Sequence, residues 1–243
     1  MLAGGVVGLL VGLTGVGAGA LMTPFLILVL GLPPTVAIAT DLVFAVTTKL
    51  AAAVMHTRKS SVDWKVALQM WKGSIPGMAS GVVALILLAA SDVSSYATIL
   101  LAFVLILTSA AIMRGVQPRR RLKSRHSFLF ASGGLGFLVA TTSVGAGALG
   151  MVLLRTKLGD NNPNKLVGTD LVHAVPIAAF AGLTFSAAGL VEAELLASLL
   201  VTSIPAAIAG SVLSSKIDAA LLRRLIGAVL LIAAAGLILR GLS

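Results

Sequence analysis

The sequence predicts an all-α integral membrane protein made of two repeats, each containing four apolar segments. Of the 243 residues, 58% are hydrophobic and only 11% are charged, and the mean hydropathy is +1.08. Soluble domains carry about 25% charged residues. Several apolar runs are longer than about 18 residues, the length that predicts a membrane-spanning helix. The alternation typical of strands is absent, so helices rather than a β-barrel would satisfy the backbone in lipid.

Most charged residues fall in short stretches that separate eight apolar segments. The first and fifth segments are interrupted by glycines, and we expect a broken helix in each, because glycine tolerates non-helical backbone angles. The other six are long enough to cross a bilayer. The eight segments span residues 2–31, 35–57, 65–90, 94–113, 127–155, 163–187, 191–213 and 219–241.

Three motifs recur in the same order, at an offset of 128 or 129 residues. Apolar sequence of low complexity would not easily repeat glycine, aspartate and proline at one spacing. Internal repeats of this kind are common in transporter folds. The paired motifs are the glycines 17/19 and 145/147, "ATDLV" (39–43) and "GTDLV" (168–172), and "SIPGMASG" (74–81) and "SIPAAIAG" (203–210).

These repeats divide the chain into three parts. The first repeat spans residues 1–113 and the second spans residues 128–243. The connection 114–127 contains six basic residues, so the positive-inside rule predicts that it is cytoplasmic.

The positions of Lys and Arg favour an inverted second repeat. The stretch 58–65 contains three basic residues and its counterpart 185–194 contains none, whereas 155–165 contains three and its counterpart 31–36 contains none. The basic side therefore changes between the halves. Inversion requires each broken segment to be re-entrant, with arms of about 12 residues that reach only the bilayer middle. Eight full crossings in a parallel repeat are the alternative.

The two broken segments predict a binding site for a small anion. Non-helical backbone at membrane depth lies inside protein or beside water. A helix that begins after each break would direct free N–H groups and a positive dipole end toward the bilayer middle. Close helix packing through small residues is the alternative reason for the glycines. The candidate substrate-binding residues are Thr14, Gly15, Gly17, Gly19, Lys49, Thr142, Ser143, Gly145 and Gly147.

Three further titratable residues lie within apolar segments, where such groups are usually functional or paired. Asp41 and Asp170 occupy matching positions in the two repeats, and His173 lies one helical turn after Asp170. We interpret them as candidates for proton coupling or gating. The alternatives are that both carboxylates brace the hairpins by accepting backbone N–H bonds, and that His173 is a neutral packing residue. For Lys49, snorkelling to the basic interface is the alternative to substrate contact.

Several function classes are excluded or unsupported. The chain has no cysteine, so it contains neither disulfides nor thiolate metal sites, and we expect no cofactor or metal. The motifs of metalloproteases, serine hydrolases and P-loop enzymes are absent, which argues against an enzyme. The net charge of +10 arises at helix ends, where it sets orientation, and it does not indicate nucleic-acid binding. We expect a multi-pass protein of a prokaryotic cell membrane, in contact with the lipid bilayer.

The paired motifs resemble those of the TauE/SafE sulfite exporter family, also called the 4-toluene sulfonate uptake permease family. The resemblance rests on "GVGAG" and "ALMTP" over 15–24, on "SVGAGAL" over 143–149, and on the "TD" after each. Ala18 and Ala146 stand where the family usually has glycine, and Val152 replaces the proline of the first copy. The resemblance implies a secondary carrier that moves sulfite, sulfonates or related organic anions by alternating access. An anion channel and a non-transporting structural membrane subunit are the alternative classes.

Overall fold

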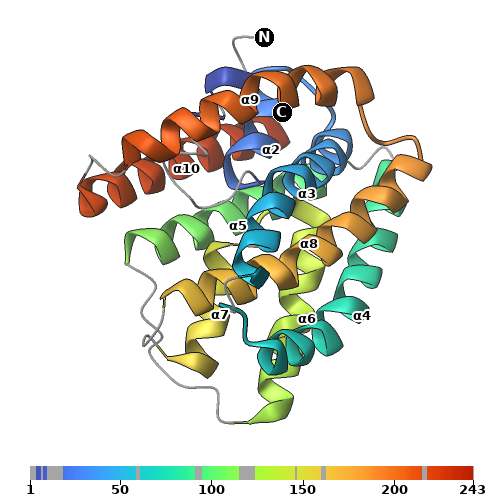
Figure 1. The fold of residues 1–243 in the computed structure, drawn as a ribbon. Coiled ribbons are helices and arrows are strands. Elements are labelled where there is room, and N and C mark those ends of the chain that lie inside the picture. Colours follow the sequence, from blue (N-terminus) through green and yellow to red (C-terminus); the bar gives the residue numbers. More distant parts are fainter. Residues whose placement is uncertain are drawn as a thin grey trace.

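In the computed structural model the described residues form helices and the turns that join them, which confirms the predicted all-α class (Figure 1). The described residues are 4–6, 8–9, 19–58, 61–90, 95–114, 124–145, 147–159, 163–214 and 218–242. The candidates Thr14, Gly15 and Gly17 lie outside them. The helices are α2 (Gly19–Leu28), α3 (Pro34–Arg58), α4 (Trp64–Ala89), α5 (Ser95–Met113), α6 (Arg125–Thr142), α7 (Ala148–Leu158), α8 (Pro163–Ala187), α9 (Ala193–Ser214) and α10 (Ala219–Leu242).

Five of the described helices have the length and apolar composition needed to cross a membrane. Each begins and ends within three residues of a segment predicted from sequence. They cover Trp64–Ala89, Ser95–Met113, Asn164–Ala187, Ala193–Gly210 and Ala220–Gly241.

The fifth apolar segment is a broken helix, as predicted. Helix α6 ends at Thr142 and α7 begins at Ala148. Between them the backbone enters the left-handed region at Ser143 (φ 56°) and reaches φ values of 118° at Gly145 and 122° at Gly147. Glycine adopts such angles without a steric penalty, so the two glycines permit the break.

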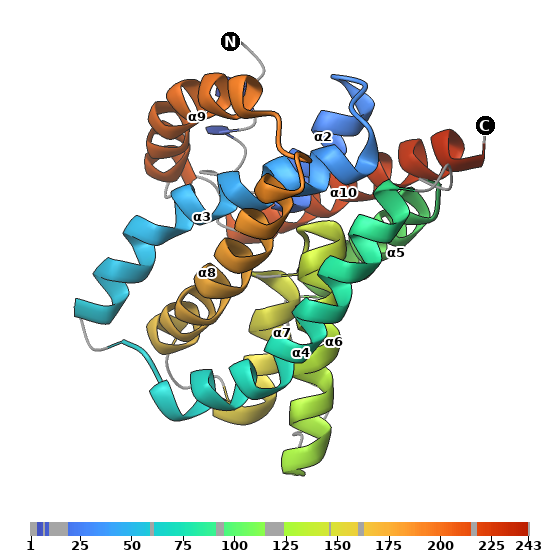
Figure 2. The ribbon, with the colours of Figure 1, turned by 90° about the vertical axis from the view of Figure 1, so that its right-hand side faces the viewer.

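Helix α7 runs back from the break toward the end of the molecule at which α6 begins (Figure 2). The Lys157 ammonium, near the end of α7, lies 5.2 Å from the ring centroid of Phe128, in the first turn of α6. Helix α7 has 11 residues, close to the expected arm, whereas α6 has 18. The expected arm of about 12 residues is therefore wrong for α6, which has 15 residues even without the exposed residues 125–127.

The third helix of the first half packs on the first helix of the second half. Gly73, Gly77 and Gly81 of α4 follow one face at four-residue spacing, and a Cβ atom at any of them would overlap backbone or side-chain atoms of α6. Small residues at this spacing allow two backbones to approach closely. From the α6 side, a Cβ atom on Gly136 would overlap the Ser74 carbonyl.

A matching contact joins the other pair of segments. A Cβ atom on Gly8, in the first described residues, would overlap the Ser203 carbonyl of α9. Gly8 and Gly136 differ by 128 positions, and Ser74 and Ser203 differ by 129. Each half therefore packs its third helix against the first segment of the other half.

Two hydrogen bonds between the halves are also repeated at matching positions. The Asp63 backbone N–H, at the start of α4, donates to Thr169 Oγ1 of α8 at 2.9 Å. The Glu192 backbone N–H, before α9, donates to Thr40 Oγ1 of α3 at 3.1 Å. Both partners in the second pair differ from those in the first by 129 positions. Each bond therefore joins the start of the third helix of one half to the second long helix of the other half, which is α8 or α3.

Candidate functional site

The start of α2 meets the break between α6 and α7 at Gly19 and Ser143. Gly19 is the first residue of α2, and Ser143 follows the last residue of α6. A Cβ atom on Gly19 would overlap the Ser143 carbonyl oxygen and would lie 3.2 Å from Ser143 Oγ. Only glycine permits this approach, so the residue that begins the first short helix is held directly against the second break.

Asp41 braces the short helix of the first half. Its side chain is fully buried on α3, and Thr23 of α2 donates its hydroxyl to Asp41 Oδ2 at 2.5 Å. Asp41 Oδ1 and Ser143 Oγ are both buried and have no hydrogen-bond partner among the described residues. Ser143 interacts with the Asp41 carboxylate, so the two polar groups face each other where the start of α2 meets the break after α6, and burying them without further partners is costly.

Asp170 has the corresponding position in the second half. It lies on α8, is 5% exposed, and accepts a hydrogen bond from the Gly147 backbone N–H at the start of α7. Its Oδ1 atom lies against Gly150, where a Cβ atom would overlap it. Each carboxylate therefore contacts the short helix that follows a break, which favours the bracing interpretation for both.

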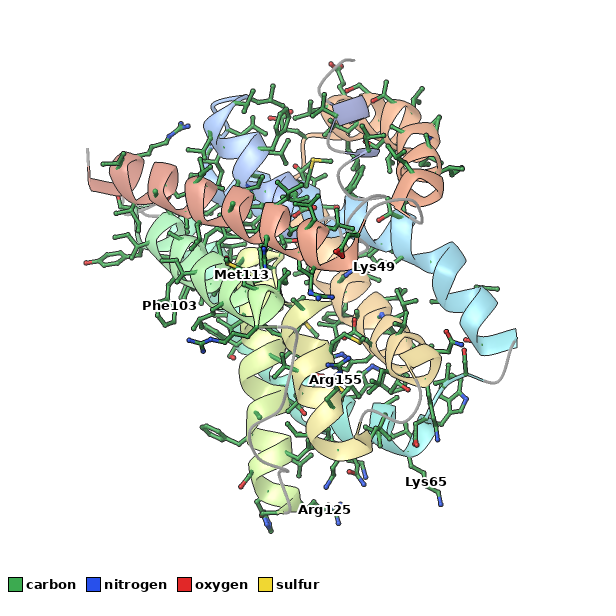
Figure 3. The ribbon with its side chains drawn as sticks, turned by 90° about the vertical axis from the view of Figure 1, so that its left-hand side faces the viewer. Lys49, Lys65, Phe103, Met113, Arg125 and Arg155 are labelled. Atoms are coloured by element: carbon green, nitrogen blue, oxygen red, sulfur yellow. The ribbon has the colours of Figure 1, made fainter. Side chains whose placement is uncertain are left out.

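Lys49 is a charged side chain close enough to both carboxylates to interact with each of them. It lies two turns after Asp41 on α3 and interacts electrostatically with both Asp41 and Asp170. Figure 3 shows Lys49 within the molecule, whereas Lys65 and Arg125 lie at one end of it. With both carboxylates ionised, the cluster of Asp41, Asp170 and Lys49 has a formal charge of −1, which a buried site holds only at a cost.

His173 connects α8 to α4. Its side chain is 1% exposed, and its Nε2 atom lies 2.8 Å from Ser74 Oγ. The Trp71 indole N–H donates to the His173 carbonyl at 3.2 Å. His173 Nδ1 has no partner among the described residues. The structure therefore brings Asp41, Lys49, Asp170 and His173 into one cluster beside the second break.

The hydroxyls predicted at the break differ in what they can offer a ligand. Thr142 Oγ1 donates to the Leu138 carbonyl at 2.6 Å and accepts from the Val144 backbone N–H at 3.2 Å, so it stabilises the break itself. Ser143 Oγ bonds no backbone group of the described chain and interacts instead with the Asp41 carboxylate. Of these two hydroxyls, Ser143 is the one whose proton is not committed to the backbone.

Thr23, Gly150 and Ser74 contact the candidate residues but were not predicted from sequence. Thr23 and Ser74 lie in the motifs "ALMTP" and "SIPG", which drew attention through their prolines. Gly150 carried no signal, because its role depends on Asp170 of another helix. No group of three His, Asp or Glu side chains in the described ranges could hold a metal ion.

Comparison with known proteins agrees with this geometry. The family model "Sulfite exporter TauE/SafE" matches residues 1–237. The chain belongs to the TauE/SafE family. A TauE/SafE relative, the probable membrane transporter protein YjnA of Bacillus subtilis (strain 168), is 34% identical over 248 residues, which are 96% of each chain. The probable membrane transporter protein YunE of the same organism is 38% identical over 69 residues, 28% of this chain and 25% of YunE. No solved structure matches the chain.

Membership of the TauE/SafE family establishes the broad class. The chain is a multi-pass membrane transporter and not an enzyme. The prediction of a TauE/SafE transporter in the cell membrane is therefore confirmed. A small anionic substrate and contact with the lipid bilayer follow from the family.

Proposed function

We propose that this TauE/SafE protein is a secondary transporter of small sulfur-containing anions, such as sulfite or sulfonates, which bind where the two breaks meet. The contact between Gly19 and Ser143 carries the proposal, because it holds the start of α2 against the break that precedes α7. The starts of α2 and α7 adjoin this point, and helix starts favour negative charge. Ser143 Oγ donates a hydrogen bond to the anion, and Lys49 supplies positive charge.

Proton coupling follows from the carboxylates at the same helix starts. Asp41 and Asp170 contact the short helices at the places where an anion would bind. An ionised carboxylate there repels an entering anion, and a protonated one does not. Protonation within the cluster therefore favours anion entry, so protons and substrate move together in our proposal.

We further propose that the two repeats are inverted and exchange access between the two membrane faces. The Asp63–Thr169 and Glu192–Thr40 hydrogen bonds support this arrangement, because each joins a connection to the second turn of a helix that inversion starts on the same face. The ion pair between Lys165 and Asp63, at 3.0 Å, supports it as well, because eight full crossings would put these two residues on opposite faces. A Gly189→Cys variant tests the topology, since inversion predicts labelling by an impermeant thiol reagent only from outside.

Uptake into proteoliposomes tests the site. We expect accumulation of labelled sulfite or of a small sulfonate, increased by an inward proton gradient. A Gly19→Ala variant should lose most of this uptake, because its Cβ atom separates the two breaks. Gly134→Ala is the matched control, since nothing lies within 4 Å of a Cβ atom there. Equal uptake by a folded Gly19→Ala protein and by Gly134→Ala would refute the proposed site.

A further inference from the structure

The hydroxyl of Ser74 determines which nitrogen of His173 carries a proton. A serine hydroxyl has one proton to donate. Ser74 Oγ donates to the Met70 carbonyl of its own helix at 2.8 Å. Its second contact, at 2.8 Å to His173 Nε2, therefore has the ring nitrogen as donor. A neutral His173 is then protonated at Nε2 and has its lone pair at Nδ1.

The surroundings hold the ring in this orientation. Ser74 is fully buried and His173 is 1% exposed, so water does not compete for the bond. The Trp71 indole fixes the backbone of His173 from one turn earlier on α4. His173 Nδ1 has no partner among the described residues, which leaves it as the ring atom that can gain a proton.

The charges around His173 link protonation of the ring to binding of the anion. Of the described charged groups, Lys49 of α3 is the one that acts electrostatically on the imidazole. Lys49 repels a proton on His173, and an anion bound beside Lys49 offsets that repulsion, so the anion and the proton favour each other's binding. Among the side chains that the structure describes, the charged and titratable residues of the helices packed against α8 are Asp41 and Lys49 (α3), Lys65 and Lys72 (α4), Arg125 and His126 (α6), and Arg155 and Lys157 (α7); the sequence of α3 also includes His56 and Arg58.

We propose that Ser74 is a positioning residue for proton coupling, which orients His173 so that Nδ1 accepts the coupled proton. This proposal rests on the proposed transport function. In the step, a proton from water on one side forms an N–H bond at Nδ1 and converts imidazole to imidazolium. Release to the other side breaks the same bond. The added charge offsets the −1 charge of the entering anion.

Internal repetition provides a matched control. Ser203 is the counterpart of Ser74, is 1% exposed, and donates to the Gly4 carbonyl at 2.9 Å. The counterpart of His173 in the first half is Phe44, which does not titrate. Ser203→Ala therefore removes a buried hydrogen bond of the same kind without touching an imidazole.

The first test measures sulfite or sulfonate uptake against external pH in proteoliposomes. We expect Ser74→Ala to move the pH midpoint of uptake downward by about half to one unit, because imidazolium loses a charge-assisted acceptor. Ser74→Thr should restore the midpoint and Ser203→Ala should leave it unchanged. An unchanged midpoint in folded Ser74→Ala would overturn the proposal, as would equal shifts in Ser74→Ala and Ser203→Ala.

The second test does not depend on transport. Nitrogen-15 NMR of histidine-labelled protein in detergent, assigned with His173→Gln, reports the tautomer directly. We expect a neutral Nε2–H ring in the wild-type protein. A neutral Nδ1–H ring would overturn the positioning role even if uptake is pH-dependent. Uptake that is clearly measurable but independent of pH would overturn the coupling, and uptake of no tested anion would overturn the proposed function itself.

Discussion

The close approach of α4 and α6 gives a prediction that two alanine substitutions on one helix test. In α6, a Cβ atom on Gly136 would lie 2.2 Å from the Ser74 carbonyl oxygen, whereas ordinary contacts begin at 3.4 Å. The backbones must therefore separate by about 1.2 Å at a contact that small residues keep tight. Overpacking of this kind costs about 1–3 kcal/mol, against a gain of about 0.5–1 kcal/mol from replacing glycine by alanine in a helix.

Gly134 is two residues away on the same helix and has nothing within 4 Å of a Cβ atom. Gly134→Ala should therefore be stabilised by the higher helix propensity of alanine, without any overlap. Gly136→Ala should be less stable than Gly134→Ala by about 1–3 kcal/mol in unfolding free energy. Thermal unfolding in one detergent measures this difference as a shift of several degrees in Tm. Equal Tm values for the two variants would refute the packing of α4 on α6.

The same comparison can be made in the first half. Gly8 lies against Ser203, with a Cβ atom 2.3 Å from the Ser203 carbonyl oxygen, and Gly5 has nothing within 4 Å. Gly8→Ala should be less stable than Gly5→Ala by a similar amount. A difference in only one half would contradict the reciprocal packing of the two halves.

Three further predictions concern the connections and the break. Asp63→Ala should destabilise the protein by about 1 kcal/mol at pH 7 through loss of the α4 N-cap and the partly exposed ion pair with Lys165. Burial raises the pKa of Asp63, but Lys165 and the Val66 N–H outweigh burial, so the pKa is lowered overall. The difference in unfolding free energy between Asp63→Ala and wild type should therefore persist down to about pH 4 and vanish below it. A constant difference down to pH 2.5 would contradict this. Thr40→Val and Thr169→Val should each cost about 1 kcal/mol in unfolding free energy, and markedly unequal losses would argue against equivalent roles. Gly147→Ala, at φ 122°, should lower Tm and anion uptake together, and wild-type values for both would contradict the need for glycine there.

The helices were predictable from sequence because each depends on its own apolar run. The break at 143–147 was predictable for the same reason, since its glycines lie within the segment that they interrupt. The matched positions of Asp41 and Asp170 could also be read from the repeated "TDLV". These features are local or depend on comparing one half with the other.

Contacts between the halves could not be predicted in this way. Nothing near Ser74 indicates that its hydroxyl meets His173, 99 positions away. The assignment of Thr142 as a substrate donor failed to anticipate its bonds to Leu138 and Val144, which depend on how the helix ends. The role of Asp63 as both N-cap and ion-pair partner likewise depends on the arrival of Lys165 from the second half.

A single cysteine at position 143 tests most directly whether an anion binds where the breaks meet. The natural chain has no cysteine, so a thiol reagent reports on Ser143→Cys alone. We predict slow modification by a small methanethiosulfonate in proteoliposomes, slowed further by an unreactive sulfonate, whereas Ser127→Cys at the exposed start of α6 should react rapidly with or without the sulfonate. Modification at position 143 that is unaffected by saturating sulfonate, in a protein that still transports it, would contradict the account.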